Sequence, residues 1–373
     1  MPNILTLSVV DHKADDYIDW FNMLEQGLFS TSGAGTEATG TALFSADTGT
    51  MELRLDYVTT GGKIHVTSLS GWDEGVAAFT ATFATPEPMG GKSWIDVLST
   101  DVHDALLGNT RIKMTGHKGD DWASGFDFND RFQLGKGNDA ASGGDGNDVL
   151  LGQRGKDLLI GGADDDVLKG GKGRDMLIAG PGDDTVEGGG GNDVLVFEGG
   201  TNVAKGGAGN DIFLFDSFST TAGGSPNVLR TTVQDFEAKD LLVFGGWGVS
   251  PDTIDPSSTT LEDIDNSTID EFRWFQRADN LVIRAGDAKV TLKDTTADQV
   301  DLDMILFTEQ SATEAVDLFD SSGTSGTLGT PPGGDPYLII TMENWSRVGD
   351  GTTSFDTYGG DISGFYLGAF PEA

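Results

Sequence analysis

Residues 143–151 (GGDGNDVLL) and 206–214 (GGAGNDIFL) follow one nine-residue pattern, G-G-x-G-x-D-x-U-x, in which U is an apolar residue. Written in rows of nine, residues 116–214 keep this register through eleven rows without an insertion or deletion. A strict short repeat is typical of a solenoid, in which each coil buries its apolar face against its neighbours. We therefore expect a mostly all-β fold with a parallel roll of eleven nonapeptides at its centre.

Two columns of this alignment carry most of the information. The sixth position is acidic in every row except one, where it is an asparagine. Its members are Asp121, Asp130, Asp139, Asp148, Asp157, Asp166, Asp175, Asp184, Asp193, Asn202 and Asp211. The eighth position is apolar in every row. Its members are Ala123, Phe132, Ala141, Leu150, Leu159, Leu168, Leu177, Val186, Leu195, Ala204 and Phe213.

The two columns have different physical roles. The glycines let six residues turn with positive φ and bring backbone carbonyls to a common point. Three residues of strand follow, and the eighth-position side chain points inward because strand side chains alternate between faces. Two rows make one coil, so each turn lies above the turn two rows earlier. The stacked pairs include Asp148 with Asp166, Asp157 with Asp175, and Asp175 with Asp193.

Stacked carboxylates repel one another unless a cation lies between them. Ca²⁺ accepts six to eight flexibly placed oxygen ligands and suits carboxylates with backbone carbonyls better than octahedral Mg²⁺ does. The sequence therefore predicts several calcium ions, with the sixth-position residues as side-chain ligands. The alternative for a tract rich in glycine and aspartate is a solvated linker, but a linker would not keep eleven apolar eighth positions. Without calcium we expect the array to be disordered.

Rows 143–151, 161–169, 170–178 and 188–196 resemble the nonapeptides of the repeats-in-toxin (RTX, hemolysin-type calcium-binding) proteins. The resemblance covers 99 of 373 residues. It implies a right-handed parallel β-roll, calcium held between stacked turns, and export through the type I secretion machinery with an uncleaved C-terminal signal. The first twenty residues lack a basic region before an apolar core, so a cleaved N-terminal signal peptide is not expected.

Four of the eleven rows, most of them near the ends of the array, depart from the RTX pattern. His117 stands at a glycine position in the first row, and Phe126 and Phe128 do so in the second. Asp164 takes the fourth position of the sixth row, and Asn202 replaces aspartate in the tenth. The resemblance therefore implies calcium-binding carboxylates most strongly for the sixth-position aspartates from Asp139 to Asp193.

The region after the array, residues 215–310, is interpreted as a β cap. Its segment 231–244 is similar to the segment that closes RTX rolls, and its apolar residues would cover the last coil. Strands are predicted at 272–276, 281–284 and 289–294, which resemble the β-structure following the rolls of serralysin-type proteases, with a short final element at 298–307. Residues 311–373 form a linker and a tail. The apolar tail segments 337–340 and 365–367 fit either an edge strand or part of the export signal.

The region before the array, residues 1–115, is predicted to be a small β-rich domain. Its helices are expected at 15–28 and 93–108, and the second helix would seal the first coil. Four segments alternate in polarity and indicate an antiparallel sheet with one solvent-facing side. These segments are 42–45, 51–57, 63–67 and 77–83, with a turn at 60–62.

The composition excludes several classes of protein. There are 60 acidic and 23 basic side chains, a formal charge of −37, so nucleic acid is not an expected partner. The chain has no cysteine, which excludes disulfides, thiolate zinc sites and cysteine nucleophiles. Its apolar runs are far shorter than the ~18 residues of a membrane helix, so it is not expected to be an integral membrane protein.

Motifs of common secreted enzymes are absent from the sequence. It contains no H-E-x-x-H, no G-x-S-x-G and no phosphate-binding loop, and no catalytic residue is assigned. The favoured hypothesis is a secreted or cell-surface calcium-binding protein, non-enzymatic, with extracellular polysaccharide or a cell surface as its target. The aromatic residues at 20–21, 274–275 and 345 fit stacking on sugars, but packing in a core or cap is the favoured interpretation. The alternative is a hydrolase, lyase or epimerase with its active site in residues 1–115 or 245–310.

Overall fold

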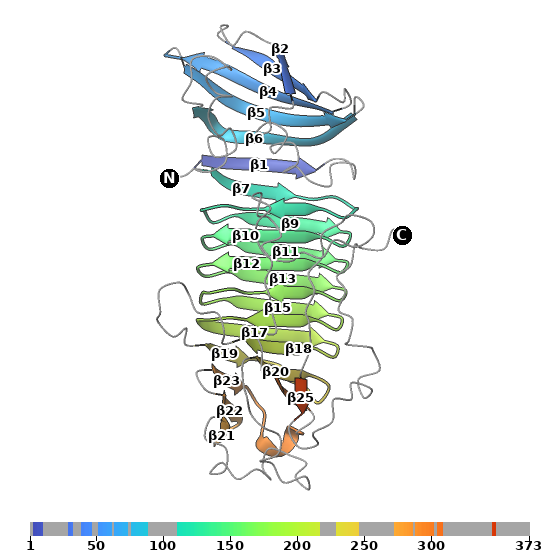
Figure 1. Ribbon diagram of the computed structural model, residues 1–373, viewed down its shortest axis with the longest axis vertical. Coiled ribbons are helices and arrows are strands. Elements are labelled where there is room, and N and C mark those ends of the chain that lie inside the picture. Colours follow the sequence, from blue (N-terminus) through green and yellow to red (C-terminus); the bar gives the residue numbers. More distant parts are fainter. Residues whose placement is uncertain are drawn as a thin grey trace. The chain divides into compact units, whose positions relative to one another are not determined.

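The computed structural model describes residues 3–9, 29–32, 39–46, 51–61, 63–73, 76–88, 110–216, 229–245, 272–285, 288–301, 304–308 and 345–347. Strands make up nearly all of the regular structure in these residues, together with one 3-10 turn at Ala297–Gln299 (Figure 1). The chain divides into two compact units, Met1–Gly171 and Lys172–Ala373. In the described part of the chain no helix has the length and apolar character needed to span a membrane.

In the first unit, the repeat rows form a parallel β-solenoid in which strands alternate between two sheets. The first sheet contains β7 (Thr110–Thr115), β9 (Arg131–Lys136), β11 (Val149–Arg154) and β13 (Val167–Lys172). The second contains β8 (Trp122–Ser124), β10 (Ala140–Asp145) and β12 (Leu158–Ala163). Leu150 lies opposite Phe132, and Leu159 lies opposite Ala141, so each strand pairs with the strand 18 residues away. The predicted parallel roll is confirmed.

An antiparallel sheet continues from the first sheet of this unit. Its strands are β1 (Asn3–Val9), β2 (Phe29–Ser32), β3 (Thr39–Ala46), β4 (Met51–Thr60), β5 (Lys63–Asp73) and β6 (Val76–Pro88), in the order β2-β3-β4-β5-β6-β1. Leu53, Leu55 and Tyr57 are buried and alternate with more exposed neighbours. The predicted strands therefore form, with one buried face.

Strand β1 joins this antiparallel sheet to the roll. It pairs antiparallel with β6 and parallel with β7, so it covers the edge that the roll would otherwise expose. The helices predicted at 15–28 and 93–108 lie outside the described residues.

In the second unit, the later repeat rows and the residues after them also form two sheets. Its first sheet runs β15 (Thr185–Gly190), β17 (Thr201–Ala208), β19 (Arg230–Val233), β23 (Ala288–Leu292), β22 (Asn280–Ala285) and β21 (Phe272–Arg277). Its second sheet runs β14 (Met176–Ile178), β16 (Val194–Phe197), β18 (Ile212–Asp216), β20 (Leu241–Gly245), β24 (Ile305–Thr308) and β25 (Trp345–Arg347). The β19–β23 and β20–β24 pairs are parallel, whereas β21, β22 and β23 form an antiparallel meander. The strands predicted after the repeats are thus present.

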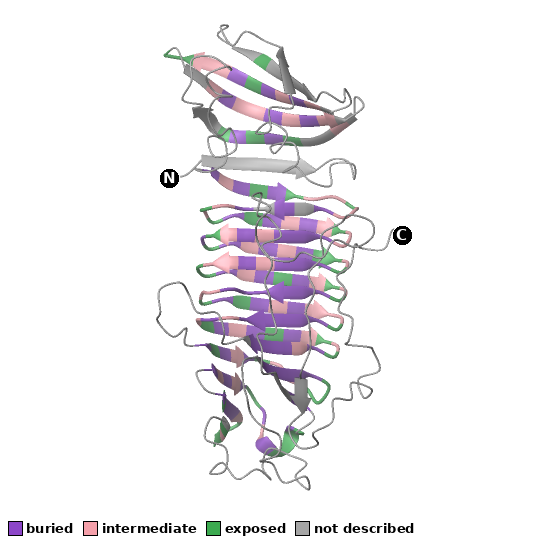
Figure 2. Ribbon diagram, in the orientation of Figure 1, coloured by how far each residue is buried: buried purple, intermediate pink, exposed green. Residues whose placement is uncertain are grey.

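The interior of the roll is a thin apolar core. Every eighth-position side chain is buried, and buried residues follow the strands in Figure 2. In the second unit, aromatic rings extend this core beyond the repeats. The ring centroids of Phe197 and Phe215 lie 5.8 Å apart, and those of Phe215 and Phe244 lie 5.2 Å apart. Stacked rings therefore connect the last repeats to β20.

The outer faces of the two sheets of the second unit differ. Along the second sheet, the outward seventh and ninth positions, such as Met176, Ile178 and Val194, are apolar and buried. Along the first sheet, the corresponding Thr185 and Lys205 are exposed. The first sheet is therefore the one whose outer face is open to solvent in this unit.

Candidate calcium sites

The sixth-position residues all lie in the interior of the turns. Each of the eleven is at most 2% exposed, although ten of them carry a carboxylate. Burying a charged group without a compensating partner is costly, so such residues need hydrogen bonds or a counter-charge. The repeat therefore holds its carboxylates where something must stabilise them.

In seven of these residues, one side-chain oxygen is held by the neighbouring coil. The amide of a sixth-position residue donates a hydrogen bond to Oδ1 of the sixth-position residue 18 positions later. The pairs and their N–O distances are Asp121 to Asp139 (2.8 Å), Asp130 to Asp148 (2.6 Å), Asp139 to Asp157 (2.9 Å), Asp148 to Asp166 (2.8 Å), Asp175 to Asp193 (2.9 Å), Asp184 to Asn202 (2.9 Å) and Asp193 to Asp211 (2.9 Å). The stacking predicted for Asp148 with Asp166 and for Asp175 with Asp193 is confirmed, whereas the pair Asp157 with Asp175 stays a prediction.

The second oxygen is different in the middle and later rows. Oδ2 of Asp139, Asp148, Asp193 and Asp211 is buried and accepts no hydrogen bond from the protein. Burial raises the pKa of Asp139 to about 9 and of Asp148 to about 8, and neighbouring carboxylates add to the shift. A cation at Oδ2 would favour the ionised form and remove this penalty.

Backbone carbonyls lie beside these bare oxygens. If Gly188 had a Cβ atom, that atom would lie 2.6 Å from Oδ2 of Asp193 and 2.8 Å from the carbonyl oxygen of Gly206. The same place in the first unit, at Gly143, is approached by Oδ2 of Asp148 and the carbonyl oxygen of Gly161. Glycine thus lets a carboxylate and a carbonyl oxygen approach one point, which a larger residue would fill.

These oxygens fit a hard cation. Among the described residues there is no cluster of three or more histidine, aspartate or glutamate side chains that could hold a metal. A metal beside Oδ2 of Asp148 or Asp193 would have a carboxylate and a backbone carbonyl within reach, and such oxygen donors suit the flexible coordination of Ca²⁺.

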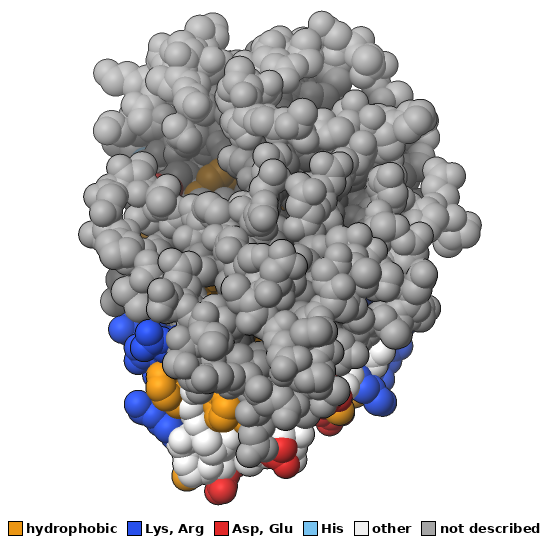
Figure 3. Space-filling view, turned by 60° about the horizontal axis from the view of Figure 1, so that its bottom comes forward, with side chains coloured by type: hydrophobic (Ala, Val, Ile, Leu, Met, Phe, Trp, Pro, Cys, Tyr) orange, Lys and Arg blue, Asp and Glu red, His pale blue; other side chains and the backbone are white. Residues whose placement is uncertain are grey.

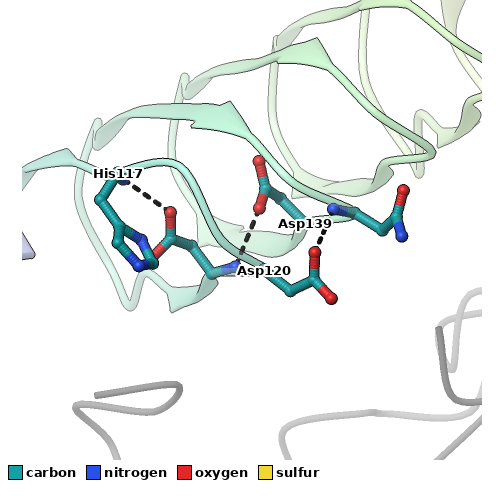
Figure 4. A network of polar contacts seen from close by, with 5 residues as sticks. His117, Asp120 and Asp139 are labelled. Atoms are coloured by element: carbon teal, nitrogen blue, oxygen red, sulfur yellow. Dashed lines mark hydrogen bonds and ion pairs between the residues drawn. The ribbon is translucent and has the colours of Figure 1, made fainter. Parts of the chain in front are cut away.

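The first two rows satisfy their carboxylates without a metal. Oδ2 of Asp121 accepts the His117 amide at 2.7 Å, and its Oδ1 lies 2.8 Å from His117 Nδ1 (Figure 4). In the second row, Asp130 accepts the amides of Ile112 at 2.6 Å and Phe126 at 3.2 Å. His117 and Phe126 are residues that replace pattern glycines, so the departures in sequence coincide with a different hydrogen-bonding pattern.

Asn202, in the tenth row, also lacks a bare oxygen. Its Oδ1 accepts the amide of Asp184, and its Nδ2 donates to the carbonyl of Gly199 at 2.7 Å. The neutral amide therefore closes its own turn with a donor that an aspartate does not have.

Sequence reasoning missed a second ladder, at the fifth position. Here the side chain accepts from the coil that follows, which is the opposite direction to the sixth-position ladder. The contacts are Asn138 amide to Asp120 Oδ1 (2.6 Å), Lys156 amide to Asn138 Oδ1 (2.9 Å), Thr201 amide to Asp183 Oδ1 (2.7 Å) and Asn210 amide to Asn192 Oδ1 (3.0 Å). Figure 4 shows the first of these beside Asp139. The signal was the excess of Asp and Asn in this column of the alignment.

A further turn, residues 235–240, stacks on the last repeat. Asp240 takes the sixth-position place, since its Oδ1 accepts the Asp211 amide at 3.0 Å. Its Oδ2 accepts the Glu237 amide at 2.8 Å. Asp235 accepts the amides of Gly206 and Gly207, both at 3.0 Å. This turn contains no glycine and leaves no oxygen of these two carboxylates bare.

A protein-family comparison agrees with this geometry. The family described as the RTX calcium-binding nonapeptide repeat (4 copies) matches residues 124–159, 160–195 and 198–219. These segments are RTX repeats. RTX repeats bind Ca²⁺, and proteins that carry them are typically secreted.

Two solved structures are similar to part of this chain. The extracellular lipase LipA from Serratia marcescens is 19% identical, with 52% of this chain and 39% of the lipase covered and a TM-score of 0.21. The AlgE6R3 subunit of the Azotobacter vinelandii mannuronan C5-epimerase is 21% identical, with 60% of this chain and 94% of that subunit covered and a TM-score of 0.17. None of the curated proteins matches the chain.

Proposed function

We propose that this chain is a secreted or cell-surface protein whose roll folds on binding calcium outside the cell and which acts there as a binding protein. The observation that carries the proposal is the set of buried Oδ2 atoms, exemplified by Asp148 and Asp193, that accept no hydrogen bond and approach the same glycine as a backbone carbonyl oxygen. Without a cation these groups oppose folding, so metal binding supplies the missing stability.

The calcium ligands are inferred from the same bare oxygen atoms. Asp139, Asp148, Asp193 and Asp211 supply a bare Oδ2, and the shared position and burial extend the role to the remaining aspartates of the central rows. Those are Asp157, Asp166, Asp175 and Asp184. Asp121, Asp130 and Asn202 keep the hydrogen bonds described above and serve mainly to close their turns.

Calcium-dependent folding also fits an export route. Before it meets calcium, an unfolded roll can pass through the type I secretion machinery, with the signal in residues 311–373. The millimolar calcium outside cells matches the ~10⁻⁴–10⁻³ M affinities of extracellular modules. The folded chain would then bind extracellular polysaccharide or a cell surface.

A calcium titration of the EDTA-stripped chain, followed by far-UV circular dichroism, tests this proposal. We expect a cooperative gain of β-signal between about 0.1 and a few millimolar calcium, and no such gain with magnesium. A spectrum that calcium does not change would contradict the proposal.

A further inference from the structure

The open face of the first sheet in the second unit carries a row of four basic residues. Arg273 lies opposite Arg284, Arg284 opposite Lys289, and Lys289 opposite Arg230. Each of the four therefore comes from a different neighbouring strand, β21, β22, β23 and β19. Residues in register across a sheet point to the same side, so the four side chains form one line across the strands.

Two more basic residues extend this line into a surface. Arg277 lies four residues along β21 from Arg273, so strand periodicity puts it on the same side. Lys293 directly follows the end of β23, four residues after Lys289, and its amide donates to the carbonyl of Val233 at 2.9 Å, which continues the pairing of β23 with β19. Five of the six are exposed, and Lys289 is half-buried. We call the six residues the basic face: Arg230, Arg273, Arg277, Arg284, Lys289 and Lys293. Figure 3 shows Lys and Arg side chains beside hydrophobic ones on the side of the unit that carries β21 and β22.

The concentration of positive charge is unusual for this chain. Six of its 23 basic residues lie on this one face, although the net charge is −37. Within the part of the chain that the structure describes, no ion pair joins any of the six to an acid. Asp279 and Asp294 lie in the turns at one end of these strands. The charges of the basic face are thus available to an external anion.

An exposed aromatic side chain lies between the two rows of cations. Phe275 is two residues from both Arg273 and Arg277 and is 42% exposed, the largest exposure of a large apolar side chain in the described residues. An aromatic ring offers a flat surface on which the apolar face of a sugar can stack.

We propose that the basic face binds a linear acidic polysaccharide that carries one carboxylate per sugar. Neighbouring strands lie ~4.8 Å apart, which is close to the length of one sugar residue in an extended chain. The carboxylates on the side of the chain that faces the sheet can therefore lie over cations of this row, with bidentate contacts from arginine side chains such as Arg273 and Arg284. Duplex DNA carries a charge every ~1.7 Å of its axis, a spacing that the row does not match.

This inference rests on the proposed function because it gives the binding role a ligand. The test is calorimetric titration of the calcium-loaded full chain with a short oligogalacturonate, too short for calcium to gel, and with its methyl ester as the neutral match. We expect the acid to bind and the ester not to bind. Equal binding of acid and ester, or binding of neither, would overturn the inference.

Matched variants locate the site. The double variant Arg273→Gln with Arg284→Gln is expected to weaken oligogalacturonate binding at least tenfold. The control Lys136→Gln with Lys156→Gln changes the net charge equally at two exposed residues of the repeat rows and is expected to leave binding unchanged. Phe275→Ala should weaken binding by several-fold without changing its salt dependence. Equal loss in the Arg and Lys pairs would show only nonspecific attraction and overturn the inference.

Two further measurements distinguish a failure of the basic-face inference from a failure of the calcium proposal, and a polysaccharide ligand from other anions. The calcium-induced circular dichroism change is recorded for every variant, because its preservation with loss of binding supports the basic face and leaves the calcium proposal intact. Vesicles containing phosphatidylserine and single-stranded DNA are offered as competing anions. Tight binding of either one, abolished by the Arg variants, with no binding of oligogalacturonate would contradict a polysaccharide ligand.

Discussion

Two kinds of turn in the second unit hold buried carboxylates in different ways. In the repeat turns, Asp193 and Asp211 each have one oxygen held by an amide and one oxygen bare. In the turn of residues 235–240, both oxygens of Asp240 and both of Asp235 accept backbone amides. The stacking arrangement is shared, but only the repeat turns leave a place for a cation.

The two turns also differ in backbone conformation at the fourth position. Gly191, at the fourth position of its row, has φ +145°, and a Cβ there would overlap the carbonyl of Gly173. Ala238 takes the fourth position of the closing turn and has no positive φ. At position 191 glycine is therefore needed, because any Cβ would meet backbone of the neighbouring coil, whereas the fourth position of the closing turn accepts alanine. From this comparison we expect the last turn to form without calcium, and the turns of Asp193 and Asp211 to need calcium.

Adding a Cβ atom at a repeat glycine should give the largest loss of stability. We expect Gly191→Ala to destabilise the calcium-loaded protein by about 3 kcal/mol, because its Cβ meets backbone that cannot move away without disturbing the neighbouring coil. The reverse change, Ala238→Gly, should cost ~1 kcal/mol or less. Urea unfolding in excess calcium measures both. Equal effects of the two changes would contradict the contrast between the turns.

Removing the charge of the closing turn should destabilise the protein whether or not calcium is present. In Asp240→Asn one side-chain acceptor becomes an NH₂ group, which leaves an amide of Asp211 or Glu237 without its acceptor. The expected cost is about 1–3 kcal/mol, measured by urea unfolding in calcium, with residual structure in EDTA followed by circular dichroism. A variant that lost stability only in calcium would show that Asp240 is itself a metal ligand.

The same substitution in a repeat turn should act through calcium. Asp193→Asn keeps an oxygen for the Asp175 amide but removes the charged ligand, so we expect the calcium midpoint to rise several-fold. Without calcium, this variant should be no less structured than the parent, because a buried charge has been removed. The midpoint is read from circular dichroism titrations of the two proteins side by side. An unchanged midpoint would exclude Asp193 as a ligand.

The smallest expected effect is a pH dependence that reverses with calcium. Burial raises the pKa of Asp139 to about 9 and of Asp148 to about 8, far above the 3.8 of an exposed carboxyl. The folded roll without metal therefore binds more protons than the unfolded chain, and its stability increases as the pH falls from about 9 towards 4. In EDTA we expect more β-signal at pH 5 than at pH 8.

With calcium present the sign of this dependence is reversed. Protons then compete with the metal for the same carboxylates, so the calcium midpoint should be higher at pH 5 than at pH 8. Circular dichroism titrations at the two pH values measure this. The same pH trend with and without calcium would argue against carboxylate ligation.

The sequence predicted the features that follow from a strict period. A nine-residue repeat places its sixth and eighth residues on defined sides of a turn and strand, so the buried aspartates and the apolar core could be derived before the structure. The alternating segments near Leu53 and Leu55 likewise predicted the antiparallel sheet, because polarity with period two is a local signal.

Features that depend on long-range register could not be derived in this way. The closing turn at Asp240 pairs with Asp211 across 29 residues instead of 18, since the chain between them breaks the period. The basic face depends on the pairing of Arg230 with Lys289, 59 residues later, which no local pattern shows.

The most direct test of the account is anomalous diffraction from crystals grown in calcium. The account predicts calcium peaks beside the bare Oδ2 atoms of Asp139, Asp148, Asp193 and Asp211, each with backbone carbonyl oxygens among its ligands. It predicts no peak at the amide-saturated carboxylate of Asp240. Repeat turns that fold with no calcium beside these aspartates, or a calcium bound at Asp240 in their place, would contradict it.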